Sequence, residues 1–246
     1  MKNLKLYVMK VGRLDMPDKG HMTPGSGVGE PISMPVYCYL IDHPKGLVLV
    51  DTGVHNEGPA TVNEEDLVVN RIAEAGYKAE DVKYVVMTHM HVDHAAYMTE
   101  FPNATFVVRR EELKAAWWPE VCEKGYVYDD YKETRGYDYL QPGDDEDYDL
   151  FLDGSVVLID TKGHTRGHQS VVVTLADGSK TVLAGDASSL RENMDEMILP
   201  GYCSNSWFAM RSLEKLKHMD REGYTILFGH DVEQQNTLKI SPDYYE

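Results

Sequence analysis

Three histidines and an aspartate crowd into one short stretch of the chain. His89, His91, Asp93 and His94 lie within six residues, although the chain of 246 residues holds only 10 histidines. They directly follow the apolar run 83–87, so the pattern predicts a turn at the end of a strand. Imidazole and carboxylate groups are ligands that zinc and other divalent first-row metals accept. The stretch therefore predicts a metal-binding turn rather than a merely polar loop.

Three further candidate ligands each come shortly after another strand-like run: His164 after 156–159, Asp186 after 181–184 and His230 after 224–228. Alone, each would be interpreted as a turn histidine or a capping aspartate, because these residue types favour such places. Their joint order favours metal ligands instead. With the first stretch they make five histidines and two aspartates, too many for one four-coordinate ion. We therefore expect two metals that share a bridging carboxylate.

Short apolar runs alternate with helical patterns and define the elements that must position these ligands. The runs are typical of strands and cover residues 4–9, 36–41, 47–51, 83–87, 105–108, 156–159, 170–175, 181–184 and 224–228. Helical spacing predicts helices over 63–75, 111–118 and 206–219. The expected apolar face of the last helix holds Trp207, Met210, Leu213 and Leu216. The pattern predicts two sheets flanked by helices in one continuous domain, 1–246.

The segment 110–150 departs from this pattern, because its periodicity is weak after the first helix. We interpret it as an insertion into the domain. Its aromatic residues suit an acyl-chain pocket, a dimer surface or ordinary packing; they are Trp117, Trp118, Tyr126, Tyr128, Tyr131, Tyr137 and Tyr139. The acidic run 144–147 is interpreted as a solvated loop rather than a calcium site.

The composition excludes several classes of protein. Hydrophobic residues make up 42% and charged residues 26% of the chain, which does not suit a collagen-like, coiled-coil or disordered protein. The net charge of −17 would repel the phosphate backbone of a nucleic acid. No apolar run approaches the length of a membrane span. We therefore expect a globular protein with a small-molecule partner, no nucleic acid and no membrane, as a monomer or a homodimer.

The three cysteines, Cys38, Cys122 and Cys203, are too few for a disulfide framework. The first residues lack the pattern of a secretory signal peptide. Both observations favour the cytoplasm. Cys38 lies in a strand-like run and is expected to fill the core.

The remaining histidines are assigned no metal. His168 follows His164 by four residues and is expected to make structural hydrogen bonds. The others have no partner at ligand spacing and are expected to be solvated; they are His21, His43, His55 and His218.

The motif HxHxDH, followed in order by His, Asp and His, resembles the metallo-β-lactamase superfamily over nearly the whole chain. The resemblance implies an α/β (α+β) fold, the αββα four-layer sandwich of that superfamily. It assigns His89, His91 and His164 to one metal, assigns Asp93, His94 and His230 to the other, and makes Asp186 the bridge. It also implies that Asp51, in the turn Asp51-Thr52-Gly53, supports the metal loop without binding metal.

Within the superfamily, the segments PVYCYLID, VDTGV, THMHVDHA, GHTRGHQS, GDAS and FGHDVEQ are similar to N-acyl-homoserine lactonases. The chain departs from them at Ala96-Tyr97, where relatives often have two glycines, and at Ser189, where lactonases carry a tyrosine that contacts the substrate carbonyl. Ser189 itself or Tyr202 is the expected replacement donor. The resemblance implies that a metal-bridging hydroxide opens a small lactone and that Asp93 passes a proton to the departing alcohol. Zinc is the expected metal, although iron, cobalt and manganese accept the same ligands.

Two kinds of alternative stay open. One is another hydrolase of the same fold, such as a thioesterase, an aromatic lactonase, a β-lactam hydrolase or a hydrolase of other esters and amides. The other is a non-catalytic protein that stores or senses zinc and leaves no coordination position free. Hydrolytic activity would distinguish them.

Overall fold

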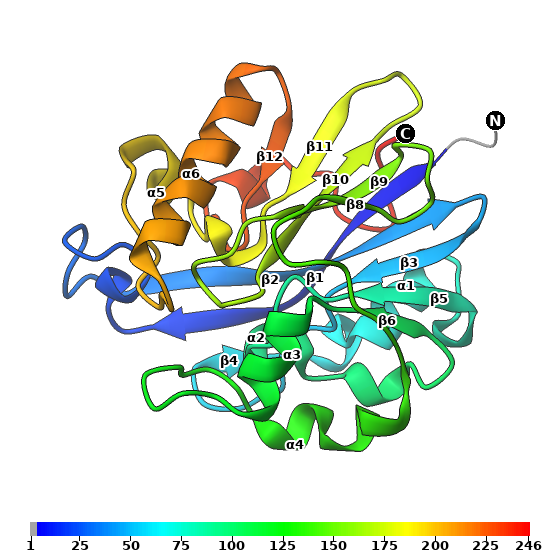
Figure 1. Ribbon diagram of the computed structural model, residues 1–246, viewed down its shortest axis with the longest axis horizontal. Helices are drawn as coiled ribbons and strands as arrows, with labels where there is room; N and C mark the ends of the chain where they lie inside the picture. The colour runs from blue at the N-terminus through cyan, green and yellow to red at the C-terminus, as the bar shows by residue number, and fades with distance from the viewer. Residues whose placement is uncertain (1–3) are drawn as a thin grey trace.

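The computed structural model describes residues 4–246, and two β-sheets form its centre (Figure 1). The first sheet has seven strands in the order β4-β1-β2-β3-β5-β6-β7. Their bounds are β1 Lys5–Met16, β2 Ile32–His43, β3 Gly46–Val50, β4 Ala60–Thr61, β5 Val82–Val86, β6 Thr105–Val107 and β7 Asp138–Leu140. Strands β1 to β3 pair antiparallel, whereas β3, β5, β6 and β7 pair in parallel.

The second sheet has five strands in the order β12-β11-β10-β9-β8. Their bounds are β8 Tyr148–Asp149, β9 Val156–Asp160, β10 Gln169–Thr174, β11 Lys180–Leu183 and β12 Thr225–Leu227. Strands β8 to β11 pair antiparallel, and β12 joins β11 in parallel. Because β9, β11 and β12 all run in the same direction, their carboxyl ends meet at one edge of the sheet.

Six helices and seven short 3-10 segments complete residues 4–246. The helices are α1 Val68–Glu74, α2 Val92–Ala95, α3 Arg110–Trp117, α4 Tyr128–Tyr131, α5 Arg191–Glu196 and α6 Ser206–Arg221. The 3-10 segments are Lys19–His21, Glu64–Asp66, Ala79–Asp81, Met98–Glu100, Lys132–Gly136, Gly185–Ala187 and Gln234–Asn236. No helix among the described residues is both long enough and apolar enough to cross a membrane.

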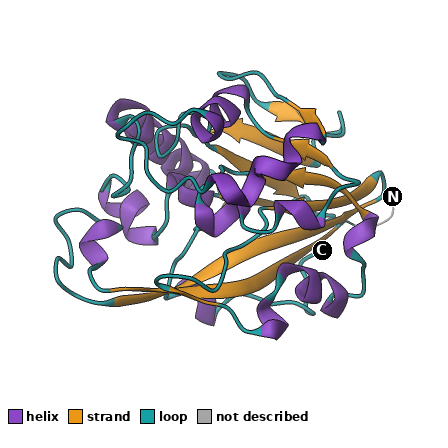
Figure 2. Ribbon diagram, turned by 90° about the horizontal axis from the view of Figure 1, so that it is seen from below, coloured by secondary structure: helices purple, strands orange, loops and turns teal. Residues whose placement is uncertain are grey.

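Alternating side chains build three apolar layers from the two sheets. In β1, Leu6 and Val8 face the second sheet, where they share a core with Val171 of β10. Their neighbour Tyr7 points the opposite way, into a core that the first sheet shares with α1, as expected for successive residues of a strand. A third core lies between the second sheet and α5 and α6. The predicted four-layer αββα sandwich is thus confirmed, and Figure 2 shows the helices on the outer faces of the sheets.

The buried face of the long helix α6 differs in part from the predicted apolar face. Its N-cap is Asn205, whose side chain accepts a hydrogen bond from the backbone N–H of Phe208. Leu213 and Leu216 are buried as predicted, but Trp207 is 68% exposed. A strict three-residue spacing drifts around a helix of 3.6 residues per turn; the buried positions are Ala209, Ser212, Leu213, Leu216 and Met219.

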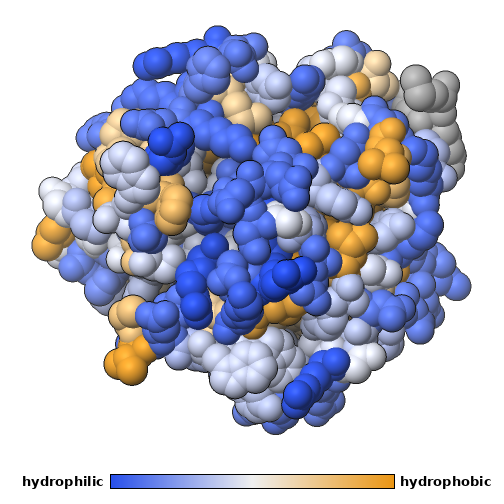
Figure 3. Space-filling model, in the orientation of Figure 1, coloured by the Kyte–Doolittle hydropathy of each residue, from blue (hydrophilic) through white to orange (hydrophobic). Residues whose placement is uncertain are grey.

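The segment 110–150 supplies an edge strand to each sheet, because β7 pairs with β6 and β8 pairs with β9. Most of its aromatic side chains pack against the first sheet's core, among them the buried Tyr131. Trp118 and Tyr128 are exposed. The face of the molecule shown in Figure 3 is mostly hydrophilic with scattered apolar patches.

Two other local predictions need correction. The predicted helix 63–75 begins with the 3-10 turn Glu64–Asp66, and its α-helical part starts only at Val68. His43, expected to be solvated, is buried at the end of β2, where its ring stacks on Phe151 at a centroid distance of 3.8 Å. His218, by contrast, is exposed as predicted.

Candidate metal centre

The predicted ligands converge at one edge of the sandwich, and they come from both sheets. His89 to His94 follow β5 of the first sheet and lead into α2. His164 lies between β9 and β10, Asp186 lies just after β11, and His230 lies just after β12. The parallel direction of β9, β11 and β12 explains why residues so distant in the sequence meet at one place. The seven side chains form two groups of ligand-sized spacing.

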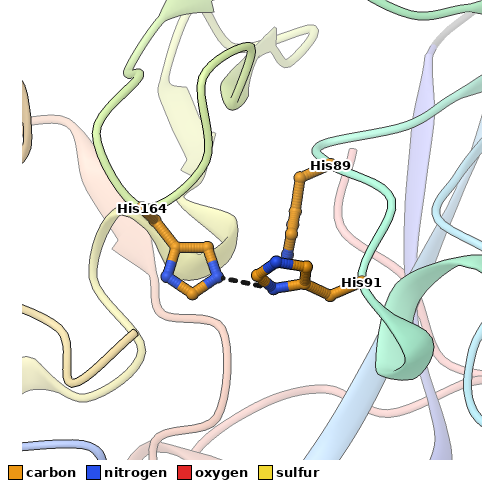
Figure 4. Close-up of side chains that lie close together, drawn as sticks. All are labelled: His89, His91 and His164. Atoms are coloured by element: carbon orange, nitrogen blue, oxygen red, sulfur yellow. Dashed lines mark hydrogen bonds between the residues drawn. The ribbon is translucent and has the colours of Figure 1, made fainter. Parts of the chain in front are cut away.

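The first group contains His89, His91 and His164, whose nearest ligand atoms all lie within 4.8 Å of one another. Nε2 of His164 lies 3.0 Å from Nδ1 of His91 (Figure 4). Burial lowers the pKa of all three imidazoles, and their mutual proximity adds to the effect for His89 and His91. The histidines are therefore neutral, which is the form of histidine that binds a metal.

The second group contains Asp93, His94, Asp186 and His230. Nε2 of His230 lies 3.1 Å from Oδ1 of Asp186 and 3.4 Å from Oδ2 of Asp93. Burial opposes the charged form of both histidines, yet the carboxylates raise the pKa of His94 and of His230. The carboxylates of this group thus favour a positive charge at this place, which a bound cation supplies when the imidazoles are neutral.

Asp186 lies between the two groups. Its Oδ1 faces His230 and, at 3.6 Å, Nε2 of His94, whereas its Oδ2 lies 3.5 Å from Nε2 of His164. Burial would raise the pKa of Asp186, but His230 and the other histidines hold it well below its usual value. An ionised carboxylate with one oxygen toward each group is the arrangement that a bridging ligand requires.

The site fits two divalent cations by a test independent of any resemblance. Four buried ligand atoms make no hydrogen bond among the described residues: Nε2 of His89, Nε2 of His94, Nε2 of His230 and Oδ1 of Asp186. The 3.1 Å between Nε2 of His230 and Oδ1 of Asp186 is an ion-pair distance without hydrogen-bond geometry. Buried polar atoms are normally hydrogen-bonded, so four unpaired polar atoms in one place require an explanation. Nitrogen and carboxylate donors that converge without protein partners match the coordination chemistry of zinc and related metals.

The opposite ring nitrogens of four ligands are held by the protein. Nδ1 of His164 lies 2.6 Å from the carbonyl oxygen of Tyr202, Nδ1 of His230 lies 2.9 Å from that of Pro35, and Nδ1 of His89 lies 3.2 Å from the Thr88 hydroxyl. Nδ1 of His94 lies 2.8 Å from Asp51. Such contacts fix ring orientation and tautomer, which leaves each Nε2 directed into the site.

His168 makes the structural hydrogen bonds predicted for it. It is fully buried, its Nε2 accepts a hydrogen bond of 3.0 Å from the backbone N–H of Asp186, and its Nδ1 lies 3.0 Å from the Thr161 hydroxyl. It therefore anchors the backbone of the candidate bridging residue.

The two candidate substrate donors differ in their surroundings. Ser189 is fully buried, and its hydroxyl finds no partner within residues 4–246. Tyr202 is 45% exposed and lines a cavity of about 160 Å³ beside His91 and His164. Tyr126 lines the same cavity, so one aromatic residue of the segment 110–150 does reach the site.

Sequence reasoning missed Glu112 and Gly125. Glu112, in α3, is fully buried and contacts the backbone beside the first group. Gly125 has a φ of +97°, and a Cβ there would lie 2.9 Å from the His91 ring. No sequence pattern indicated a role at the site for either residue. Glu112 lies in the charged first turn of a helix, which is typical of a surface position, and Gly125 lies in a loop.

Comparison with known proteins identifies the class that this fold and site define. The model of the metallo-beta-lactamase superfamily matches residues 33–230. An N-acyl homoserine lactonase, AttM, of Agrobacterium fabrum is 31% identical over 264 aligned positions, covering 100% of both chains. A second N-acyl homoserine lactonase, from a Bacillus species, is 33% identical and covers 98% of each chain.

Solved structures agree with these relatives. An N-acyl homoserine lactone hydrolase with the product N-hexanoyl-L-homoserine bound at its catalytic metal centre superposes with a TM-score of 0.87, at 29% identity and full coverage of both chains. A quorum-quenching N-acyl homoserine lactone lactonase gives a TM-score of 0.88 at 30% identity, covering 100% of this chain and 99% of the other. The chain therefore belongs to the metallo-β-lactamase superfamily, and within it to the family of the N-acyl homoserine lactonases.

Proposed function

We propose that the chain is a dinuclear metal-dependent hydrolase that opens the ester of an N-acyl-homoserine lactone. One observation carries the proposal: Asp186 of the second group directs one oxygen toward each of the two groups, and four buried ligand atoms of the site make no hydrogen bond among the described residues. His89, His91 and His164 would hold one ion, and Asp93, His94 and His230 would hold the other. The activity named for the full-length relatives supports the lactone as substrate.

The two bound ions would supply a hydroxide nucleophile at neutral pH, because such ions lower the pKa of bound water to about 7. The side chains do the rest. Asp93 is the group placed for proton transfer, because its side chain keeps 16% of its surface exposed while its neighbours His94 and His230 are buried. When a hydroxide forms the new C–O bond to the lactone carbonyl carbon, Asp93 takes up the remaining proton of that hydroxide. As the ring C–O bond breaks, Asp93 passes this proton to the departing alkoxide, so the opened product carries a carboxylate and a free hydroxyl.

Ser189 is the proposed donor to the substrate carbonyl, with Tyr202 as the second candidate. Ser189 has a buried hydroxyl without a described partner, and an unused buried donor suits an oxyanion that forms only during reaction. The exposed ring of Tyr202 beside the cavity suits contact with the rest of the substrate.

Zinc is the proposed metal because the donors are imidazole nitrogens and carboxylates. Iron, cobalt and manganese are the alternatives. The three cysteines Cys38, Cys122 and Cys203 are unpaired, which suits the proposed reducing, cytoplasmic setting. The proposed partner is a small lactone or ester alone, with no nucleic acid and no membrane, and the protein acts as a monomer or homodimer.

A panel of substrates tests this function. Purified protein, with its metal content measured, is mixed with homoserine lactones of several acyl lengths, aromatic lactones, thioesters and β-lactams, and acid release is followed. We expect about two metals per chain and the fastest release from homoserine lactones. Faster turnover of a thioester or an aromatic lactone would contradict the proposed substrate and favour that class of hydrolase instead. Tight metal binding with no hydrolysis of any substrate would favour the zinc-storing alternative.

A further inference from the structure

The carboxylate of Glu112 joins two loops that carry metal ligands. Oε1 accepts hydrogen bonds from the backbone N–H of Met90 at 2.8 Å and from the Tyr126 hydroxyl at 3.0 Å. Oε2 accepts from the Thr165 hydroxyl at 2.6 Å and from the backbone N–H of Gly167 at 3.2 Å. All four partners are donors, so the carboxylate oxygens are filled by protein alone.

The partners of the Glu112 carboxylate lie next to the histidines of the first group in the sequence. Met90 stands between His89 and His91, and Thr165 directly follows His164. The three histidines of the first group thus come from two loops that meet at one buried side chain. Nothing in the hydrogen bonds of Glu112 reaches Asp93, His94, Asp186 or His230.

The backbone around Glu112 is built for this contact. A Cβ on Gly167 would lie 2.2 Å from the Glu112 nitrogen, so only a glycine lets the His164 loop approach α3 so closely. On the other side, Val92 donates to the carbonyl of Gly125, whose missing side chain leaves room for the His91 ring. Helix α3 and the segment after it therefore pack tightly against both loops.

We propose that Glu112 is a positioning residue for the three-histidine metal site: it fixes the separation of His91 and His164 so that the first ion binds tightly. The inference rests on the proposed dinuclear function. Contacts of this kind typically change metal affinity by 10-fold to 100-fold. Glu112 contacts the backbone between His89 and His91 and the residues that follow His164, whereas it contacts no residue of the second group. Its loss is therefore expected to weaken the three-histidine site more than the second site.

Glu112→Gln is the informative substitution, because it keeps the shape of the side chain. A carboxylate accepts at both oxygens, whereas an amide presents an NH₂ group on one side. That NH₂ must then face either the Met90 and Tyr126 donors or the Thr165 and Gly167 donors. One of the two loops loses its anchor in either orientation.

The experiment measures metal content and site identity rather than activity alone. Wild type, Glu112→Gln and the control Glu111→Gln are loaded with Co(II) and dialysed against increasing chelator. Glu111 lies next to Glu112 on α3, and its carboxylate pairs with Lys114 at the surface. Ring N–H signals of the histidines, shifted in NMR spectra by the paramagnetic ion, show which group is filled.

We expect the wild type and Glu111→Gln to hold two ions, and Glu112→Gln to release the ion of the three-histidine group at 10-fold to 100-fold lower chelator strength. Its second ion should be released as in the wild type. Equal retention of both ions, or equal weakening of both, would overturn the inference. A wild type that holds fewer than two ions would instead overturn the proposed function, before any variant is compared.

Two milder variants keep the inference testable should Glu112→Gln not fold. Thr165→Val removes one donor on the His164 side, and Tyr126→Phe removes one donor on the His91 side. Each should weaken the first ion by a smaller factor and leave the second unchanged. Wild-type affinity for the first ion in both variants would contradict the proposed role.

Discussion

Oδ2 of Asp51 lies 2.8 Å from Nδ1 of His94, and both side chains are almost completely buried. The same oxygen accepts a hydrogen bond of 2.7 Å from the Thr88 hydroxyl, and Oδ1 accepts one of 2.7 Å from the Thr88 backbone N–H. Asp51 adopts a left-handed backbone conformation with φ of 60°, which a non-glycine residue adopts at a cost. The fold tolerates this strain at the residue that orients His94, a candidate metal ligand of the second group.

Asp51→Asn is therefore expected to weaken the second ion by 10-fold to 100-fold, because an amide cannot accept from His94 on one side and from the Thr88 backbone N–H on the other. Chelator competition on the Co(II)-loaded protein measures the change. The exposed Asp81→Asn serves as the control. Unchanged affinity of the second ion in Asp51→Asn would show that Asp51 is dispensable for the site.

Asp93→Asn is expected to slow lactone hydrolysis by about 100-fold to 10,000-fold, because an amide cannot deliver the proton to the leaving alkoxide. Acid release at saturating substrate measures the rate, with metal content determined on the same sample. Asp220→Asn, on the exposed side of α6, is the control. Retention of full activity would remove Asp93 from the mechanism.

Removal of the metals is expected to lower the melting temperature. At a free metal concentration 100-fold above Kd, binding stabilises the folded state by about 2.7 kcal/mol per site, which corresponds to roughly 5–10 °C for a chain of this size. Thermal unfolding with and without chelator measures the shift, and added Zn(II) should reverse it. An identical melting temperature in both conditions would contradict a buried metal site.

Burial raises the pKa of Asp130 to about 6, although the nearby His55, 3.4 Å away, opposes the shift. Because the folded-state pKa exceeds the unfolded value, the neutral acid stabilises the fold at low pH, and this contribution is lost as pH rises through about 6. Asp130→Asn, which stays neutral, should gain stability relative to the wild type between pH 5 and pH 8. Urea unfolding at the two pH values measures the gain.

The control is Asp220→Asn, on the exposed side of α6 rather than beside Asp130, because the charge of the neighbour Asp129 itself helps to raise the pKa of Asp130. This control should leave the pH dependence of the wild-type stability unchanged. A pH-independent difference for Asp130→Asn as well would mean that Asp130 titrates normally in the folded protein.

Arg109 anchors the acidic run 144–147 from inside the protein. It is almost fully buried, and its guanidinium donates to the carbonyl oxygens of Gly143 and of Glu146, the latter at 3.1 Å. Arg109→Met should lower the free energy of unfolding by about 3 kcal/mol, because the loop loses its hydrogen bonds to the buried, charged guanidinium. Arg110→Met, on the exposed neighbour, should change it by less than about 0.5 kcal/mol. Equal effects in urea unfolding would contradict the anchoring role.

The convergence of the seven candidate ligands could be predicted because each follows an apolar run, and such runs end where a sheet ends. The contacts that hold the ligands could not. Glu112 stands in the charged stretch Arg110–Glu112, which favours solvent until the structure shows the donors that surround it. His43 has no sequence signal for the ring of Phe151, which is more than a hundred residues away. Sequence patterns report the local preferences of residues, whereas the burial of Glu112 and His43 depends on partners that are distant in the sequence.

The origin of the ligands in both sheets has a mechanical consequence. His89 to His94 belong to the first half of the sandwich, and His164, Asp186 and His230 belong to the second. Two bound metal ions would thus cross-link the two halves of the sandwich. The cysteines of the chain are unpaired, so no disulfide provides such a link. Loss of the metals would then weaken the interface between the two sheets, so that the protein would lose rigidity and activity together.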